Sequence, residues 1–182
     1  MANTQTHFEL FELPVSFDID LQDLSQRYRE LQRVVHPDKF VNASDRERRL
    51  SVENAAAINE AYQILKSPQR RARYMLELQS VSFDDEKDMA LDPAFLMEQI
   101  ELREALGELN QSENPLESLN KIMADIKARI TAIIEAIREG LVQPQLDDSQ
   151  KNNIKQLIQK MQFLNKLQEE AEYQEEKLLD TL

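Results

Sequence analysis

The residues of this sequence best suited to chemistry are an imidazole and a carboxylate separated by one proline, in the tripeptide His36-Pro37-Asp38. A histidine next to a carboxylate could act as a general base. However, two neighbouring side chains on an exposed tip offer a substrate no pocket, no oxyanion donor and no protection from water. Loops at the tips of rigid elements also serve as contact sites. We therefore interpret the tripeptide as a contact loop and expect no enzymatic activity.

Two predicted helices place this loop at the tip of a hairpin. The apolar residues before it recur at helical spacing, at Leu21, Leu24, Tyr28, Leu31 and Val35. Because Pro37 disfavours the helical conformation of the residue before it, the first helix should end at or before His36. A second helix should begin near Ser44 or Asp45. Its predicted core positions are Leu50, Ala57, Ile58, Ala61, Tyr62 and Leu65.

The first helix also carries a cationic side. Arg29 and Arg33 project away from the apolar stripe, and Arg27 lies at its edge. Taken alone, these residues indicate only a solvated helix face, on which long side-chain stems lie against the core.

The composition favours a chain that is helical almost throughout. Its 182 residues include two glycines, no cysteine and two histidines, His7 and His36. This excludes a disulfide framework, a cysteine nucleophile and a cysteine- or histidine-rich metal site, so we expect no cofactor. Because no apolar run could span a bilayer and no signal sequence is evident, we expect a soluble, cytoplasmic protein with no membrane partner.

The net charge of −12 is confined to the second half of the chain. Through Leu76, eleven basic residues balance eleven acidic ones, which leaves 22 − 11 = 11 basic and 34 − 11 = 23 acidic residues for the rest. This shift predicts two domains, at 1–76 and 89–182, joined by a linker at 77–88. The acidity argues against a nucleic-acid partner and could by itself serve only solubility.

The second half is predicted to be an antiparallel three-helix bundle, with helix starts at Asp92-Pro93, Asn114-Pro115 and Asp147-Asp148-Ser149. The first of these helices has two apolar faces. One is the core face, formed by Phe95, Leu102, Leu106 and Leu109. The other consists of Leu96, Met97 and Ile100, flanked by Glu101 and Glu104. In the last helix Phe163 is predicted to point away from the inner face. These exposed apolar groups could be incidental, or they could bind a protein.

Several segments resemble a J domain: the apolar stretch His7 to Pro14, the tripeptide His36-Pro37-Asp38, the run Ala57 to Leu65, and Ser67 to Tyr74. With Ala94 to Glu104 and Glu175 to Asp180 included, nearly the whole chain resembles the HscB family, the J-type co-chaperones of bacterial iron–sulfur cluster assembly. The fold that this implies is all-α, with a J domain followed by the three-helix bundle. One departure is Glu12, where the family usually has glycine; we expect the turn to shift slightly there.

The resemblance implies two partners for an adaptor without an active site. The first is a specialised DnaK/HscA-type ATPase, contacted by His36, Pro37, Asp38, Arg29, Arg33 and Arg27. The second is the IscU-type scaffold protein on which iron–sulfur clusters are built, contacted by Leu96, Met97, Ile100, Glu101, Glu104 and Phe163. By this resemblance, the chain delivers the scaffold to the ATPase and stimulates ATP hydrolysis, which promotes cluster transfer.

Two further hypotheses compete with this one. A general J-protein that delivers unfolded clients should carry a Gly/Phe-rich segment or a cysteine-rich zinc module after the J domain, and this sequence has neither. A structural helical protein could instead dimerise through the isoleucine-rich seam of residues 116–137. A sedimentation measurement that shows a stable dimer, with no binding to any ATPase, would favour that hypothesis.

Overall fold

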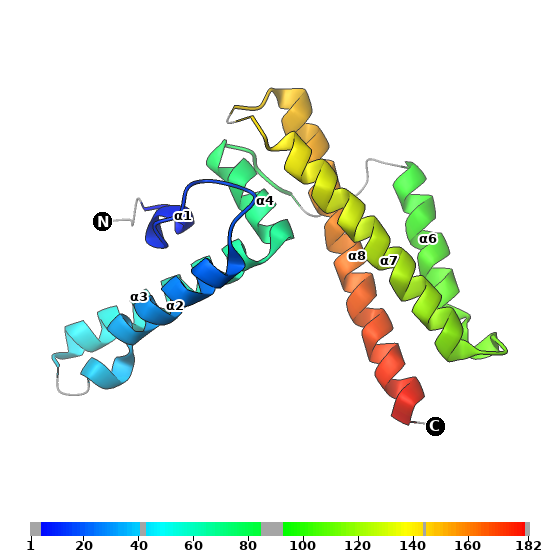
Figure 1. The fold of residues 1–182 in the computed structure, drawn as a ribbon, viewed down its shortest axis with the longest axis horizontal. Helices are drawn as coiled ribbons and strands as arrows, with labels where there is room; N and C mark the ends of the chain where they lie inside the picture. Colours follow the sequence, from blue (N-terminus) through cyan, green and yellow to red (C-terminus); the bar gives the residue numbers. More distant parts are fainter. Residues whose placement is uncertain (1–4, 41–42, 85–92, 144, 181–182) are drawn as a thin grey trace. The chain divides into compact units, whose positions relative to one another are not determined.

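A computed structural model describes residues 5–40, 43–84, 93–143 and 145–180 of the chain, and all the regular structure in these ranges is helical (Figure 1). The chain divides into two compact units, Met1–Leu78 and Gln79–Leu182. The predicted all-α fold, a helical hairpin with short helices followed by an antiparallel three-helix bundle, is confirmed. The predicted linker, residues 77–88, lies partly outside the described residues, and α4 continues to Leu78.

The first unit is built on the predicted hairpin. Its elements are α1 (His7–Leu10), α2 (Leu21–Val35), the 3₁₀ helix η1 (Pro37–Phe40), α3 (Asp45–Lys66) and α4 (Pro68–Leu78). The Asp20 carboxylate caps α2 by accepting hydrogen bonds from the backbone amides of Gln22 and Asp23. At the start of α3, Ser44 forms a capping box with Glu47. The largest fully buried side chains described in this unit are Phe8, Phe11, Leu24, Leu65 and Leu76.

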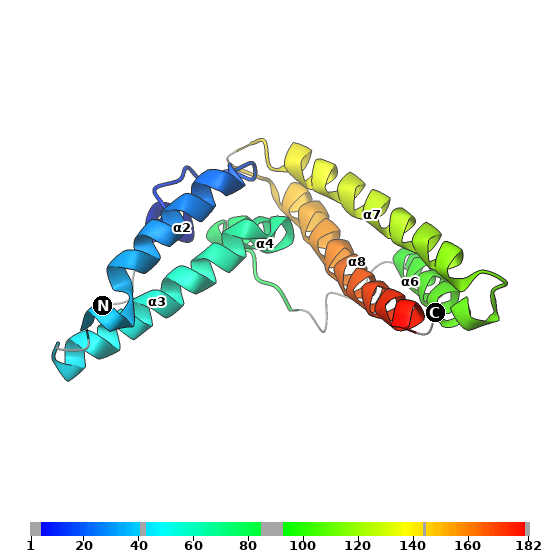
Figure 2. The ribbon, with the colours of Figure 1, turned by 60° about the horizontal axis from the view of Figure 1, so that its bottom comes forward.

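The prediction of which α3 residues lie in the core is only half right. Ile58, Ala61 and Leu65 are buried, whereas Leu50 is 53% exposed and Ala57 is also exposed. The reason lies in the layering, because α4 packs at the end of the hairpin away from the loop, as Figures 1 and 2 show. Towards the loop the described part of the hairpin is two helices thick, so no described element covers the side chains that face outwards there.

The second unit consists of α6 (Pro93–Gly107), the 3₁₀ helix η2 (Leu109–Gln111), α7 (Pro115–Gly140) and α8 (Asp148–Asp180). Helix α7 runs antiparallel to both α6 and α8 (Figures 1 and 2). Asn114 caps α7 by accepting the amide of Glu117. At the other end of α7, a Cβ on Gly140 would lie 3.0 Å from Cγ1 of Ile154, so the glycine allows close approach to α8.

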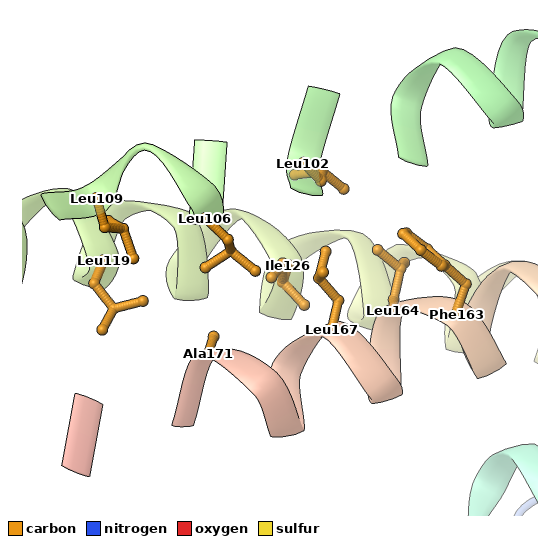
Figure 3. Close-up of a cluster of buried hydrophobic side chains, with 9 residues drawn as sticks. All are labelled: Leu102, Leu106, Leu109, Leu119, Ile126, Phe163, Leu164, Leu167 and Ala171. Carbon is orange, nitrogen blue, oxygen red and sulfur yellow. The ribbon is translucent and has the colours of Figure 1, made fainter. Parts of the chain in front are cut away.

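One part of the core of this unit is a cluster of apolar side chains from α6, η2, α7 and α8 (Figure 3). Its buried members are Leu102, Leu106, Leu109, Leu119, Ile126, Phe163, Leu164, Leu167 and Ala171. Other buried apolar side chains of the unit, among them Ile137, Ile154 and Ile158, lie outside this cluster. The predicted seam of α7 faces this cluster, since Ile126 is fully buried and Met123, Ile130 and Ile133 pack against it. The seam on which the dimerisation hypothesis relied therefore packs within the unit itself.

Candidate partner-binding surfaces

The predicted contact loop begins where α2 ends. Helix α2 stops at Val35, and His36 leaves the helical conformation with φ −57° and ψ 127°, as expected for a residue before proline. The chain then turns through η1, in which the Lys39 amide donates to the His36 carbonyl at 3.0 Å. His36 is exposed. The side chains of Pro37 and Asp38 lie outside what the structure describes.

The cationic side of α2 is exposed as predicted. Arg29 and Arg33 both lie on the solvent face, one helical turn apart, while Leu24 of the same helix is fully buried. This face leads directly into the loop, because Arg33 is three residues before His36. The arrangement suits electrostatic contact with an acidic surface.

Arg27, the third predicted arginine, has an intramolecular role. Its Nε donates to both carboxylate oxygens of Asp23 at 3.0 Å, and its Nη1 donates to the carbonyl of Phe11 at 3.0 Å. The hydrogen bond to Asp23 raises the pKa of Arg27 above its ordinary value. The Arg27 side chain thus links α2 to the turn after α1. These hydrogen bonds engage two of the three guanidinium nitrogens that a partner contact would use.

That turn explains the departure at Glu12. The residue lies two positions beyond α1 with φ 52°, in the left-handed region where glycine has no steric penalty. The expected slight shift of the turn stays a prediction, because it concerns a difference from relatives that carry glycine at this position. The chain keeps the conformation suited to glycine and places a glutamate in it.

A groove of about 300 Å³ lies along the side of α2 that carries Asp23 and Arg27. It was not predicted from the sequence. Its lining residues are Leu10, Phe11, Glu12, Asp23, Gln26, Arg27, Glu30, Leu31 and Val34. Val34 is 64% exposed, so the loop end of α2 offers apolar as well as cationic contacts. The sequence signal was present, since Val34 lies off the apolar stripe of α2.

The second predicted surface, on α6, is exposed. Leu96, Met97 and Ile100 are 56%, 58% and 42% exposed, and Glu101 and Glu104 beside them are exposed too. The core face of the same helix is also confirmed, since Leu102 and Leu106 are buried. Helix α6 therefore has an apolar face towards the bundle and a second, acid-flanked apolar face towards solvent; we call Leu96, Met97, Ile100, Glu101 and Glu104 the α6 patch.

The predicted exposure of Phe163 is wrong. Its side chain is only 7% exposed and belongs to the core cluster (Figure 3). The ring meets Phe95 of α6 edge to face, with centroids 5.6 Å apart, and the Arg103 guanidinium lies 5.7 Å from its centroid. Phe163 points away from α7 because it faces α6, which covers it. Its proposed role in contacting the scaffold therefore cannot rest on an exposed ring.

Arg129, which the sequence did not single out, holds α6 from the other side. Its guanidinium pairs with Glu98 of α6 and, through Nε, with Asp125 one turn earlier on α7 at 2.8 Å. Glu98 lies on the side of α6 away from Leu96 and Ile100. The ion pair and the Phe95–Phe163 contact together fix which face of α6 is exposed.

Among the residues that the structure describes, no three His, Cys, Asp or Glu side chains are grouped so that they could hold a metal ion. Within the same residues, none of the helices is long and apolar enough to cross a membrane. The chemistry that these surfaces can supply is charge, shape and apolar contact.

Comparisons with known proteins assign a family to each unit. Residues 7–74 match the model described as the DnaJ domain, and residues 91–172 match the HSCB C-terminal oligomerisation domain. The chain is 41% identical over 177 residues to a co-chaperone protein HscB homolog of Shewanella amazonensis, which covers 96% of this chain and 99% of that protein.

Solved structures agree with these matches. Chaperone HscB from Vibrio cholerae superimposes with a TM-score of 0.85 at 37% identity, covering 96% of this chain and 99% of that one. The human co-chaperone protein HscB superimposes with a TM-score of 0.84 at 26% identity, covering 96% of this chain and 84% of that one.

Proposed function

Because the chain belongs to the HscB family of J-domain co-chaperones, we propose that it delivers the iron–sulfur cluster scaffold protein to a specialised DnaK/HscA-type ATPase and stimulates that ATPase. The observation that carries the proposal is the presence of two exposed surfaces of opposite chemistry. One is the cationic face of α2 that leads to the His36 loop. The other is the α6 patch, which is apolar with an acidic rim.

The ATPase surface has the properties of an orienting contact. Arg29 and Arg33 carry full positive charge on the solvent side of α2, so they would speed and orient association with an acidic partner more than they strengthen the final complex. These contacts would fix the position on the ATPase at which the loop that begins at His36 binds. To change the rate of hydrolysis, the loop must bind the hydrolysis-competent state of the ATPase more tightly than the resting state.

The scaffold surface has the properties of a protein-binding site. Leu96 and Met97 are flexible, unbranched at Cβ and more than half exposed, so they can adapt to an apolar partner. Glu101 and Glu104 flank them, which favours a partner whose apolar contact is surrounded by basic residues. This surface lies on a different unit from the loop. The proposal therefore gives the two partners separate binding sites on the chain.

Two assays test the two halves of the proposal. In calorimetry with purified scaffold protein, Leu96→Ala combined with Met97→Ala should weaken binding by about tenfold or more. The matched control is Val142→Ala, which removes an apolar side chain that is 77% exposed elsewhere in the same unit. Equal binding by the double variant and the unchanged chain would contradict the assignment of this surface.

In a steady-state ATPase assay, His36→Gln should abolish stimulation, and reversing the charge of Arg29 and Arg33 should weaken it most at low salt. The matched control is Lys127→Glu, which reverses an exposed charge on α7. Undiminished stimulation by His36→Gln would refute the role of the loop.

A further inference from the structure

At Gly107, neither the backbone conformation nor the packing of the described residues requires a glycine. Gly107 is the last residue of α6, and its φ is not in the left-handed region that commonly places glycine after a helix. A Cβ built on it would meet nothing within 4 Å, in contrast to Gly140, whose Cβ would press against Ile154. Because alanine is more favourable than glycine in a helix, an alanine at this position should improve the fold.

What Gly107 leaves open is a groove of about 480 Å³ between the end of α6 and the C-terminal half of α8. Its apolar lining comes from Leu106 and Leu109 on one side and from Tyr173 and Leu178 on the other. Tyr173 is 58% exposed, and the ammonium group of Lys177 lies 4.3 Å from its ring centroid. The cation–π contact favours a fixed position of the ring on the groove wall.

This groove continues the α6 patch. At 100° per residue, Gly107 falls on the same side of α6 as Leu96 and Ile100. It lies seven residues after Ile100, about 10 Å along the helix at the usual rise per residue. Glu104 lies between them on this side, and Glu170 is at the far wall of the groove. A partner that lies along α6 would reach the groove.

We propose that the α6 patch and the Gly107 groove form one continuous binding surface, and that the scaffold protein inserts an apolar side chain flanked by basic residues into the groove. This inference rests on the proposed function, because it takes the scaffold as the partner bound at the patch. The absence of a side chain at Gly107 admits the inserted group, and Glu104 and Glu170 complement the basic residues beside it.

The test fills the groove without disturbing the patch. Gly107→Trp should weaken scaffold binding in calorimetry by about tenfold or more, and Gly107→Ala, which adds one methyl group, should weaken it measurably but less. Ala124→Trp, at an exposed position of α7, controls for the added indole. Far-UV circular dichroism checks the helical content of each variant, and Tyr173→Ala, which removes a groove wall from the opposite side, should also weaken binding.

The outcomes separate this inference from the proposed function. If the Leu96 and Met97 substitutions weaken binding while Gly107→Trp and Tyr173→Ala do not, the groove is no part of the surface and the inference is overturned. If the unchanged chain does not bind the scaffold, the proposed function fails and the inference fails with it. If the groove variants alter only self-association in sedimentation, the occupant is a second copy and the inference is again overturned.

Discussion

Replacing Phe163 with alanine distinguishes a residue that would itself contact the scaffold from one that positions α6, the helix that we propose contacts it. The ring is 7% exposed and packs edge to face on Phe95 of α6. Truncating a buried phenylalanine costs about 3–5 kcal/mol, of which the aromatic pair accounts for about 0.5–1.5 kcal/mol. Truncating Leu96, which is 56% exposed, should change stability by less than about 0.5 kcal/mol.

These magnitudes predict different outcomes for the two variants. Phe163→Ala should loosen α6 from the bundle, so the amides of residues 93–107 should exchange with solvent about 100-fold faster, the equivalent of about 3 kcal/mol. Scaffold affinity should fall in proportion to the fraction of molecules in which α6 is docked. Leu96→Ala should weaken scaffold binding while the exchange of α6 stays unchanged.

The assay is hydrogen exchange followed by mass spectrometry on the free chain, paired with calorimetry against the scaffold protein. Phe163→Leu serves as the matched variant, because it keeps an apolar group in the same space and should preserve most of both the protection and the affinity. If Phe163→Ala lowers the affinity while α6 keeps its protection, the ring itself contacts the scaffold and the reasoning is refuted.

Three further predictions concern individual residues. Glu12→Gly should stabilise the first unit by about 0.5–1 kcal/mol because φ at this position is 52°, as measured by urea unfolding followed through tyrosine near-UV circular dichroism, and Glu12→Ala should not. Burial, opposed by the carboxylates of Glu60 and Glu77, lowers the pKa of His7. The unfolded chain then binds the proton more readily, so stability should fall as the pH drops below about 6.5, and His7→Gln should remove this dependence; an unchanged slope would contradict it. Glu98→Gln and Arg129→Gln should be non-additive in urea unfolding by about 0.5 kcal/mol, and strict additivity would show that the ion pair does not hold α6.

The parts of the fold that follow from local chemistry could be predicted from the sequence. Asp20 and Asn114 begin helices because their side chains can accept hydrogen bonds from backbone amides that have no partner within the helix. The two faces of α6 could be separated because the residues of each recur at helical spacing, and the structure exposes Leu96 and Met97 while burying Leu102.

The errors arose where a third element decides what is covered. Leu50 has the spacing of a core residue, but among the described elements no third layer reaches the loop end of the hairpin. At Glu12 the sequence predicted only a slight shift of the turn and not the left-handed conformation, with φ 52°, that the chain adopts after α1. Both depend on where another segment ends, which the spacing of apolar residues does not show.

Phe163 shows the same effect, with a consequence for function. A single apolar stripe describes a helix with one neighbour, but α8 packs against α7 along one side and against α6 along another, so two stripes are buried. The Phe163 side chain, which was predicted to point away from the core, therefore packs in the part of the core between α8 and α6. Because the surface on α6 is presented only while α6 is docked, a buried residue such as Phe163 can control scaffold binding without touching the scaffold. Loss of binding in a variant therefore identifies a contact only where the packing of α6 is shown to be intact.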